Sequence, residues 1–301
     1  MKLLKSRNNL QKNNMIKTVC KGLILFVISM LFINLSAMAI DNNSNPESTK
    51  PILKSIPNDY SKHKFSLGLE LFPYSYKEPN LMKMNGLFYG INGAYSFYLG
   101  KDYFLQLEAR ASGGKTKYSS NGTGSIGTKN PNKLLEARVL YNRHSQLNTN
   151  TDVHPFIGLG FRYKEDDSTG ETTTTGHNGC LRKSNYYYVP VGLSIHYNLQ
   201  QGWGLYISGE YDIFLGGKQV TYGAFERLKH SQSKGYGLRS EILLEKTFDN
   251  YIFSIGPYVN YWNIKDSAEV PVYCRLCGVN HYSKEPKNTT HETGVKIKFT
   301  F

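Results

Sequence analysis

The sequence has little of what a membrane-spanning helical protein needs. Its 301 residues have a mean hydropathy of −0.44, and one apolar run approaches 20 residues, at the N-terminus. Each helical span needs about 20 consecutive apolar residues, so the composition argues against a helical membrane protein. Glycine has no strict period, which excludes collagen, and an apolar fraction of 40% excludes a disordered chain. Cysteine is scarce, with four residues, whereas tyrosine is abundant, with 23.

Acidic residues are absent from the first 39 positions, which carry six Lys and Arg. An apolar run over 22–33 follows, and then Ala37-Met38-Ala39. This order predicts a secretory signal peptide over 1–39, the alternative being a retained anchor helix. Its removal lowers the formal net charge from +13 to +7, so the basic excess does not indicate a nucleic-acid partner. Residues 40–61, rich in Asn, Ser, Pro and Lys, are expected to be a flexible periplasmic lead-in.

From residue 62 to 301 apolar and polar residues alternate with period two, which indicates β-strands. In one segment Leu87, Tyr89 and Ile91 share a face, while Gly90 and Asn92 lie on the other. The strands are about 11–16 residues long, enough to cross a bilayer at a tilt, which takes about 9–11 residues. We expect strands at 63–76, 85–99, 103–118, 132–143, 154–164, 186–197, 203–218, 234–247, 250–264 and 291–301.

Short and long connections alternate between these strands. The long, polar ones are expected near 77–84, 119–131, 165–185, 219–233 and 265–290. Tight turns on one side and long loops on the other are typical of outer-membrane barrels. The pattern therefore predicts an all-β fold, a transmembrane antiparallel up-and-down barrel of about ten strands, with eight or twelve as alternatives. Aromatic girdles are expected near the short turns (Tyr103, Tyr141, Tyr197, Trp203, Tyr251, Phe301) and the long loops (Tyr118, Tyr163, Tyr186, Tyr187, Tyr261, Trp262).

The last strand carries the most specific signal. It ends on Phe301, with Val295, Ile297 and Phe299 at every second place behind it. This resembles the C-terminal signal of bacterial outer-membrane proteins, and residues 155–163 resemble a strand of small barrels of the porin and surface-antigen type. The resemblance implies location in the outer membrane and recognition of these four residues by the barrel assembly machinery.

Charged residues occupy the polar face of the strands, which would point into the lumen. In a barrel of about ten strands the lumen is narrow and largely filled by side chains. Because an unpaired buried charge is costly, we expect these residues to pair with one another, although a small conducting lumen remains an alternative. The predicted lumen residues are Glu70, Glu108, Arg110, Glu136, Arg138, Arg162, His196, Glu210, Asp212, Arg239, Glu241, Glu245, Lys296 and Lys298.

Two prolines, Pro190 and Pro257, fall within predicted strands. Proline cannot donate a ladder hydrogen bond, so we expect a β-bulge or a missed strand boundary at each position.

Three cysteines lie in the predicted outer loops: Cys180, Cys274 and Cys277. Outside the cell disulfides persist, so a bridge between Cys274 and Cys277, or between one of them and Cys180, is expected. Zinc binding by these thiols and His281 is a weaker alternative, because two separate loops would have to meet. We therefore expect no cofactor and no metal.

Motifs of enzymatic barrels fit this chain poorly. Proteases of the omptin type use paired acids with an Asp-x-His pair, and Asp152-Val-His154 falls on the expected periplasmic side. His196 with Ser194, a candidate pair for a lipid A deacylase, lies on that side too. Asp166-Asp167, His177 and His230-Ser231 are in outer loops but lack either pattern.

The loops suggest the function. They are rich in Lys, Ser, Thr, Asn and Gly, and the stretches from Lys115 and from Lys218 to Lys234 are basic. Such segments can bind lipopolysaccharide or a host polyanion. We expect a non-enzymatic outer-membrane protein with a structural or adhesin-like surface role, the alternative being a narrow porin. An outer-membrane protease or lipid A-modifying enzyme is the least favoured reading.

Overall fold

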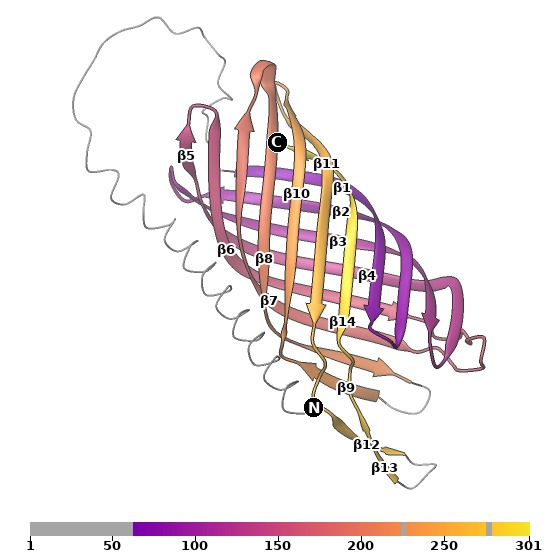
Figure 1. The fold of residues 1–301 in the computed structure, drawn as a ribbon. Coiled ribbons are helices and arrows are strands. Elements are labelled where there is room, and N and C mark those ends of the chain that lie inside the picture. Colours follow the sequence, from indigo (N-terminus) through magenta and orange to yellow (C-terminus); the bar gives the residue numbers. More distant parts are fainter. Residues whose placement is uncertain (1–62, 224–226, 275–278) are drawn as a thin grey trace, which may run out of the picture. The chain divides into compact units, whose positions relative to one another are not determined.

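The computed structural model describes residues 63–223, 227–274 and 279–301. Ten antiparallel strands form a closed barrel, in which the last strand pairs with the first. Figure 1 shows the strands wrapping into this cylinder. The expected up-and-down barrel of ten strands is confirmed. The barrel strands are β1 (His63–Glu78), β2 (Met82–Tyr98), β3 (Tyr103–Ser120), β4 (Gly124–Arg143), β6 (Thr151–Asp167), β7 (Leu181–Asn198), β8 (Trp203–Tyr222), β10 (Gly235–Thr247), β11 (Ile252–Ile264) and β14 (Asn288–Thr300).

Short elements extend the connections. β5 (Ser145–Asn148) pairs with β6, β9 (Arg227–Gln232) pairs with β8, and β12 (Val270–Cys274) pairs with β13 (Val279–Ser283). A single 3₁₀ turn, η2 (Gln200–Gly202), precedes β8. Within the described ranges, no helix is long and apolar enough to cross a membrane.

The two ends of the barrel differ. The terminal end holds the start of β1, the end of β14 and the short connections 99–102, 149–150, 199–202 and 248–251. The loop end holds the connections 168–180 and 265–287, together with β9.

The long connections expected at 77–84 and 119–131 are wrong. The ladder runs on to Glu78↔Met82 and Ser120↔Gly124, so each connection is a turn of three residues. These strand ends are polar on their outer face, which is why their sequence resembles a loop.

Alternation places one row of each strand outside and one row inside. On β1 the outward Leu67, Leu69 and Leu71 are 52%, 61% and 53% exposed, whereas the inward Glu70 is 4% exposed. Such an apolar exterior suits lipid, and ring closure pairs the backbone groups that a free sheet edge would leave bare.

Aromatic side chains ring the terminal end as expected. Tyr103 and Tyr141 stack with centroids 5.5 Å apart, and both are exposed. At the loop end the expectation is partly wrong, because Tyr186 and Trp262 are 5% and 2% exposed and belong to the interior. Both residues fall on the inward row of their strands. Alternation along the strand, and not distance from a loop, therefore determines whether their side chains face the lumen or the outside.

The bulges expected at the prolines themselves are absent, although the β7–β8 ladder shifts register between Tyr187 and Tyr188, just before Pro190. The β6–β7 ladder passes from Ile157↔Val191 to Gly160↔Tyr188 with no change of register. The β10–β11 ladder has a similar gap beside Pro257. Each proline leaves a gap toward one neighbouring strand and stays in register with the other.

Candidate functional site

The middle of the lumen is filled by one connected layer of charged and aromatic side chains. Arg110 Nε donates to Glu70 Oε1 at 2.6 Å, and its Nη1 lies 2.8 Å from Glu292 Oε2. Arg239 donates from Nη1 and Nη2 to the two carboxylate oxygens of Glu136 at 3.0 and 3.1 Å. The two parallel hydrogen bonds between Arg239 and Glu136 combine charge with fixed geometry, so they hold strands β10 and β4 in place.

The ion pairs cross the lumen. Arg162 Nη2 donates to Glu292 Oε1 at 2.8 Å, and their strands, β6 and β14, are five places apart in the ring of ten. Arg239 and Glu136 join β10 to β4, four places apart. Side chains from facing strands therefore meet across the lumen at this height.

All ten strands supply a residue to this layer. Eight of the ten side chains are buried, and the two arginines Arg110 and Arg239 are 11% and 10% exposed. The residues, in ring order, are Glu70, Phe88, Arg110, Glu136, Arg162, Tyr188, Asp212, Arg239, Tyr258 and Glu292.

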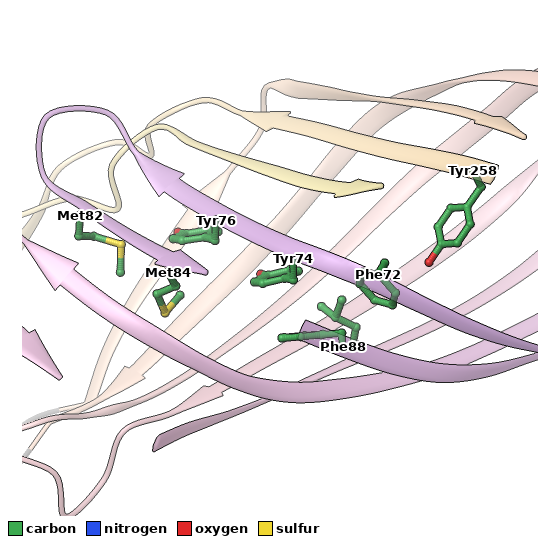
Figure 2. Close-up of a cluster of buried hydrophobic side chains, with 8 residues drawn as sticks. Phe72, Tyr74, Tyr76, Met82, Met84, Phe88 and Tyr258 are labelled. Carbon is green, nitrogen blue, oxygen red and sulfur yellow. The ribbon is translucent and has the colours of Figure 1, made fainter. Parts of the chain in front are cut away.

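An aromatic cluster lies against the layer on its loop-end side. Figure 2 shows Phe72 and Tyr74 of β1 beside Phe88 of β2, with Met84 further along. Tyr74 stacks on Phe88 with centroids 4.3 Å apart, and all four side chains are at most 1% exposed. Arg110 lies 5.0 Å from the Phe72 centroid, so the guanidinium joins the ionic layer to the aromatic cluster.

A second ionic cluster lies nearer the loop end. Arg182 donates to Glu78 Oε1 at 3.0 Å and to Asp166 Oδ2 at 2.9 Å. Lys164 Nζ lies 3.2 Å from the Tyr76 ring centroid. Glu285, in the connection between β13 and β14, is 5% exposed, and burial raises its pKa to about 7.

The lumen is more open toward the terminal end. Arg138 donates to both carboxylate oxygens of Glu210 and from Nε to Glu108 at 2.8 Å. Further along, Lys296 pairs with Glu241, His196 lies 3.2 Å from Glu245, and Lys298 stands over the Tyr206 ring. The side chains of Glu108, Arg138, Lys296 and His196 are between 16% and 34% exposed.

The residues considered for catalysis fall into two groups, one at each end of the barrel. Asp152 and His154 lie at the terminal end, where His154 Nε2 is 2.8 Å from His144 Nδ1. Asp166 is held by Arg182, and the exposed His177 contacts Thr175. Among the described side chains, no group of three or more His, Cys, Asp and Glu could hold a metal ion.

One contact at the loop end was not visible in the sequence. His230 Nε2 of β9 lies 3.1 Å from Ser283 Oγ of β13, which is the reach of a base to a nucleophile. Burial lowers the pKa of His230, which keeps its ring neutral. His230 Nδ1 is buried and has no hydrogen-bond partner, so the carboxylate that orients the base in a triad is missing.

The cysteines are placed only in part. Cys180 carries a free thiol in the described structure, is half-buried, and has its pKa raised by burial. Cys277 and the side chain of Cys274 lie outside the described residues, so their pairing stays a prediction.

The expected assembly-signal residues lie on the outer face of β14. Val295, Phe299 and Phe301 are 50%, 39% and 59% exposed, and Ile297 is partly exposed on the same row. The backbone of Phe301 exchanges two hydrogen bonds with Phe65, which closes the ring. Their recognition by an assembly machinery stays a prediction.

Comparison with solved structures gives the class of protein: the chain has the fold of bacterial outer-membrane β-barrels. The outer-membrane protease OmpT from Escherichia coli matches with a TM-score of 0.56 and 11% identity, over 80% of this chain and 98% of that one. The translocator domain of the autotransporter NalP from Neisseria meningitidis matches over 89% and 95%, with a TM-score of 0.40 and 11% identity. No family model and no curated protein matches the sequence. At such identity the likeness shows the fold alone.

Several interior residues escaped the sequence reasoning. Glu292 continues the inward row of Lys298 and Lys296 by two further steps of two residues, and Lys164 and Asp166 continue the row of Arg162. Asp166 lies beyond the expected strand 154–164, whereas Lys164 and Glu292 lie within the expected strands and were left out of the predicted lumen residues.

Proposed function

We propose that this protein resides in the outer membrane, with its terminal end in the periplasm and its loop end outside. We propose that it acts as a surface-interaction protein and conducts no solutes. The layer of buried side chains across the lumen carries this proposal, since an ion path needs a continuous wet axis. The exposed apolar exterior and the predicted export signal support the location.

Single-channel recording in a planar bilayer tests the lumen. The refolded full-length barrel is expected to give no stable open level. Replacing Phe72, Tyr74 and Met84 by alanine together removes most of the aromatic cluster but keeps all ten side chains of the layer, so this variant is also expected to stay closed. Stable openings of the unmodified protein would favour the porin alternative.

The basic loop end favours an anionic surface partner. Lys218 on β8, Lys229 on β9 and Lys234 after it are exposed, and Arg227 stacks on Tyr222 at 5.2 Å. Retention on immobilised heparin is expected, with elution by moderate salt, because exposed charges are screened. The variant K218Q/K229Q/K234Q should elute early, and unchanged retention would contradict the assignment.

A hydrolase is the second candidate, favoured by the contact between His230 and Ser283. A fluorophosphonate probe would label Ser283 if that hydroxyl were nucleophilic, and S283A would remove the label. Absence of labelling in the folded, unmodified barrel would end this candidate.

A further inference from the structure

A furrow runs along the outer wall of the barrel. It has a volume of about 760 Å³, and apolar side chains line most of it. Its depth comes from β3, which presents Ala111 and Gly113 where the flanking strands present Tyr89, Ile91 and Leu135. Tyr89 and Ile91 are 72% and 61% exposed, so they stand as a wall beside the small residues.

Toward the loop end the same row becomes basic. After Ala111 and Gly113, the next outward residues of β3 are Lys115 and Lys117, at steps of about 7 Å. On β4, Lys133 lies in register with Gly113 and lines the furrow. The furrow therefore runs from an apolar stretch directly into a group of ammonium groups.

Two further lysines complete this group. Lys77 of β1 and Lys83 of β2 are directly paired in register, and both are exposed. Like charges directly opposite each other on a sheet are destabilising. Lys133 has Glu165 at 3.1 Å, but no described carboxylate forms an ion pair with Lys77, Lys83, Lys115 or Lys117. Within the described ranges, these four cations on three adjacent strands therefore have no carboxylate counter-ion.

We propose that this wall binds one phosphorylated, acylated glycolipid of the outer leaflet. Its phosphates would lie among Lys77, Lys83, Lys115 and Lys117, and an acyl chain would lie in the furrow over Ala111. The charge of the lysines selects an anionic headgroup, and the apolar furrow continuous with them selects a lipid over a free anion. This inference rests on the outer-membrane location proposed above.

Diphosphorylated lipid A is the probe. The barrel, refolded without lipid in neutral detergent, is titrated with it, and native mass spectrometry counts the bound molecules. One molecule is expected to bind, whereas phosphatidylcholine should not. Because each basic residue near an anionic lipid surface contributes roughly 1 kcal/mol, the four substitutions in K77Q/K83Q/K115Q/K117Q should together weaken binding by roughly a thousandfold.

Two matched variants make the test specific. K218Q/K229Q/K234Q removes loop-end lysines away from the furrow and should bind lipid A normally, although its heparin retention is lost. A111F fills the furrow and should weaken lipid A binding while leaving the lysines intact. If the quadruple variant does not fold, K115Q/K117Q carries the test.

Either of two results would overturn the proposal: unchanged affinity of the lysine variant, or equal loss in the loop-end control. If millimolar inorganic phosphate displaces lipid A and A111F has no effect, the wall has an anion site but no site for an acyl chain. This result would also overturn the proposal. Conductance and heparin retention report on the proposed function separately, so failure of one does not decide the other.

Discussion

Glu136 is the carboxylate around which three arginines of the lumen gather. It receives both guanidinium nitrogens of Arg239 and lies 3.4 Å from each of Arg110 and Arg162, while being 6% exposed. A buried carboxylate with three arginines around it offsets charges that water does not reach. Its loss would leave those charges partly uncompensated.

E136A is therefore expected to lower the free energy of unfolding by about 3–5 kcal/mol. Urea unfolding in detergent, followed by tryptophan fluorescence, measures this difference. K133A removes an exposed ion pair with Glu165 on the outer wall, and it should cost less than about 1 kcal/mol. Equal effects of the two variants would show that the lumen pairs contribute no more to the free energy of unfolding than an exposed pair does.

Glu285 is expected to make the loop end sensitive to pH. Burial raises its pKa from 4.5 to about 7 in the folded chain, so the protonated form is favoured. The associated stability is fully present below about pH 4.5 and is lost as the pH rises through about 7. It amounts to about 3 kcal/mol, since one pKa unit is worth about 1.4 kcal/mol.

Hydrogen exchange measures this dependence. After correction for intrinsic rates, the backbone of 265–274 and 279–287 is expected to exchange faster at pH 8 than at pH 5. The amide of Ser267, which donates to Glu285 O at 2.9 Å, is a direct reporter. In E285Q the difference should vanish, and a difference that persists there would assign the pH dependence to another group.

At the scale of elements, period two predicted the ten barrel strands, because each strand has one face toward lipid and one toward the lumen. The same pattern predicted that Arg162, Lys296 and Lys298 lie on the inward row of their strands. It could not predict where the ladder ends, since β3 and β4 continue past Tyr118 with polar residues on both faces. Nor could it predict the contact of His230 with Ser283, which depends on how two connections fold.

Strand β14 closes the ring, so its end should control assembly. F299A/F301A is expected to lower the folded fraction several-fold, since Phe299 also packs against Phe253 at 5.4 Å. F97A is the control, because Phe97 is exposed to a similar degree at the same end but belongs to β2. The folded fraction is read from unheated gel samples of membranes. Equal loss in F97A would indicate a general need for aromatic residues at that end.

At the scale of the whole molecule, closure decides behaviour in detergent. A barrel whose first and last strands pair has no free edge to fray, so it should stay folded in cold dodecyl sulfate. The unheated protein is expected to migrate faster than the boiled one, and its apparent mass should change in one step with temperature. A single position before and after boiling would argue against a closed barrel.

The contacts across the lumen join residues that are distant in the chain: 130 positions separate Arg162 from Glu292, and 103 separate Glu136 from Arg239. Pairs such as Arg138 with Glu108 join neighbouring strands and can form in a partial sheet, whereas Arg162 meets Glu292 only once β14 is in place. The pairs between distant strands therefore favour the complete ring over a partial sheet.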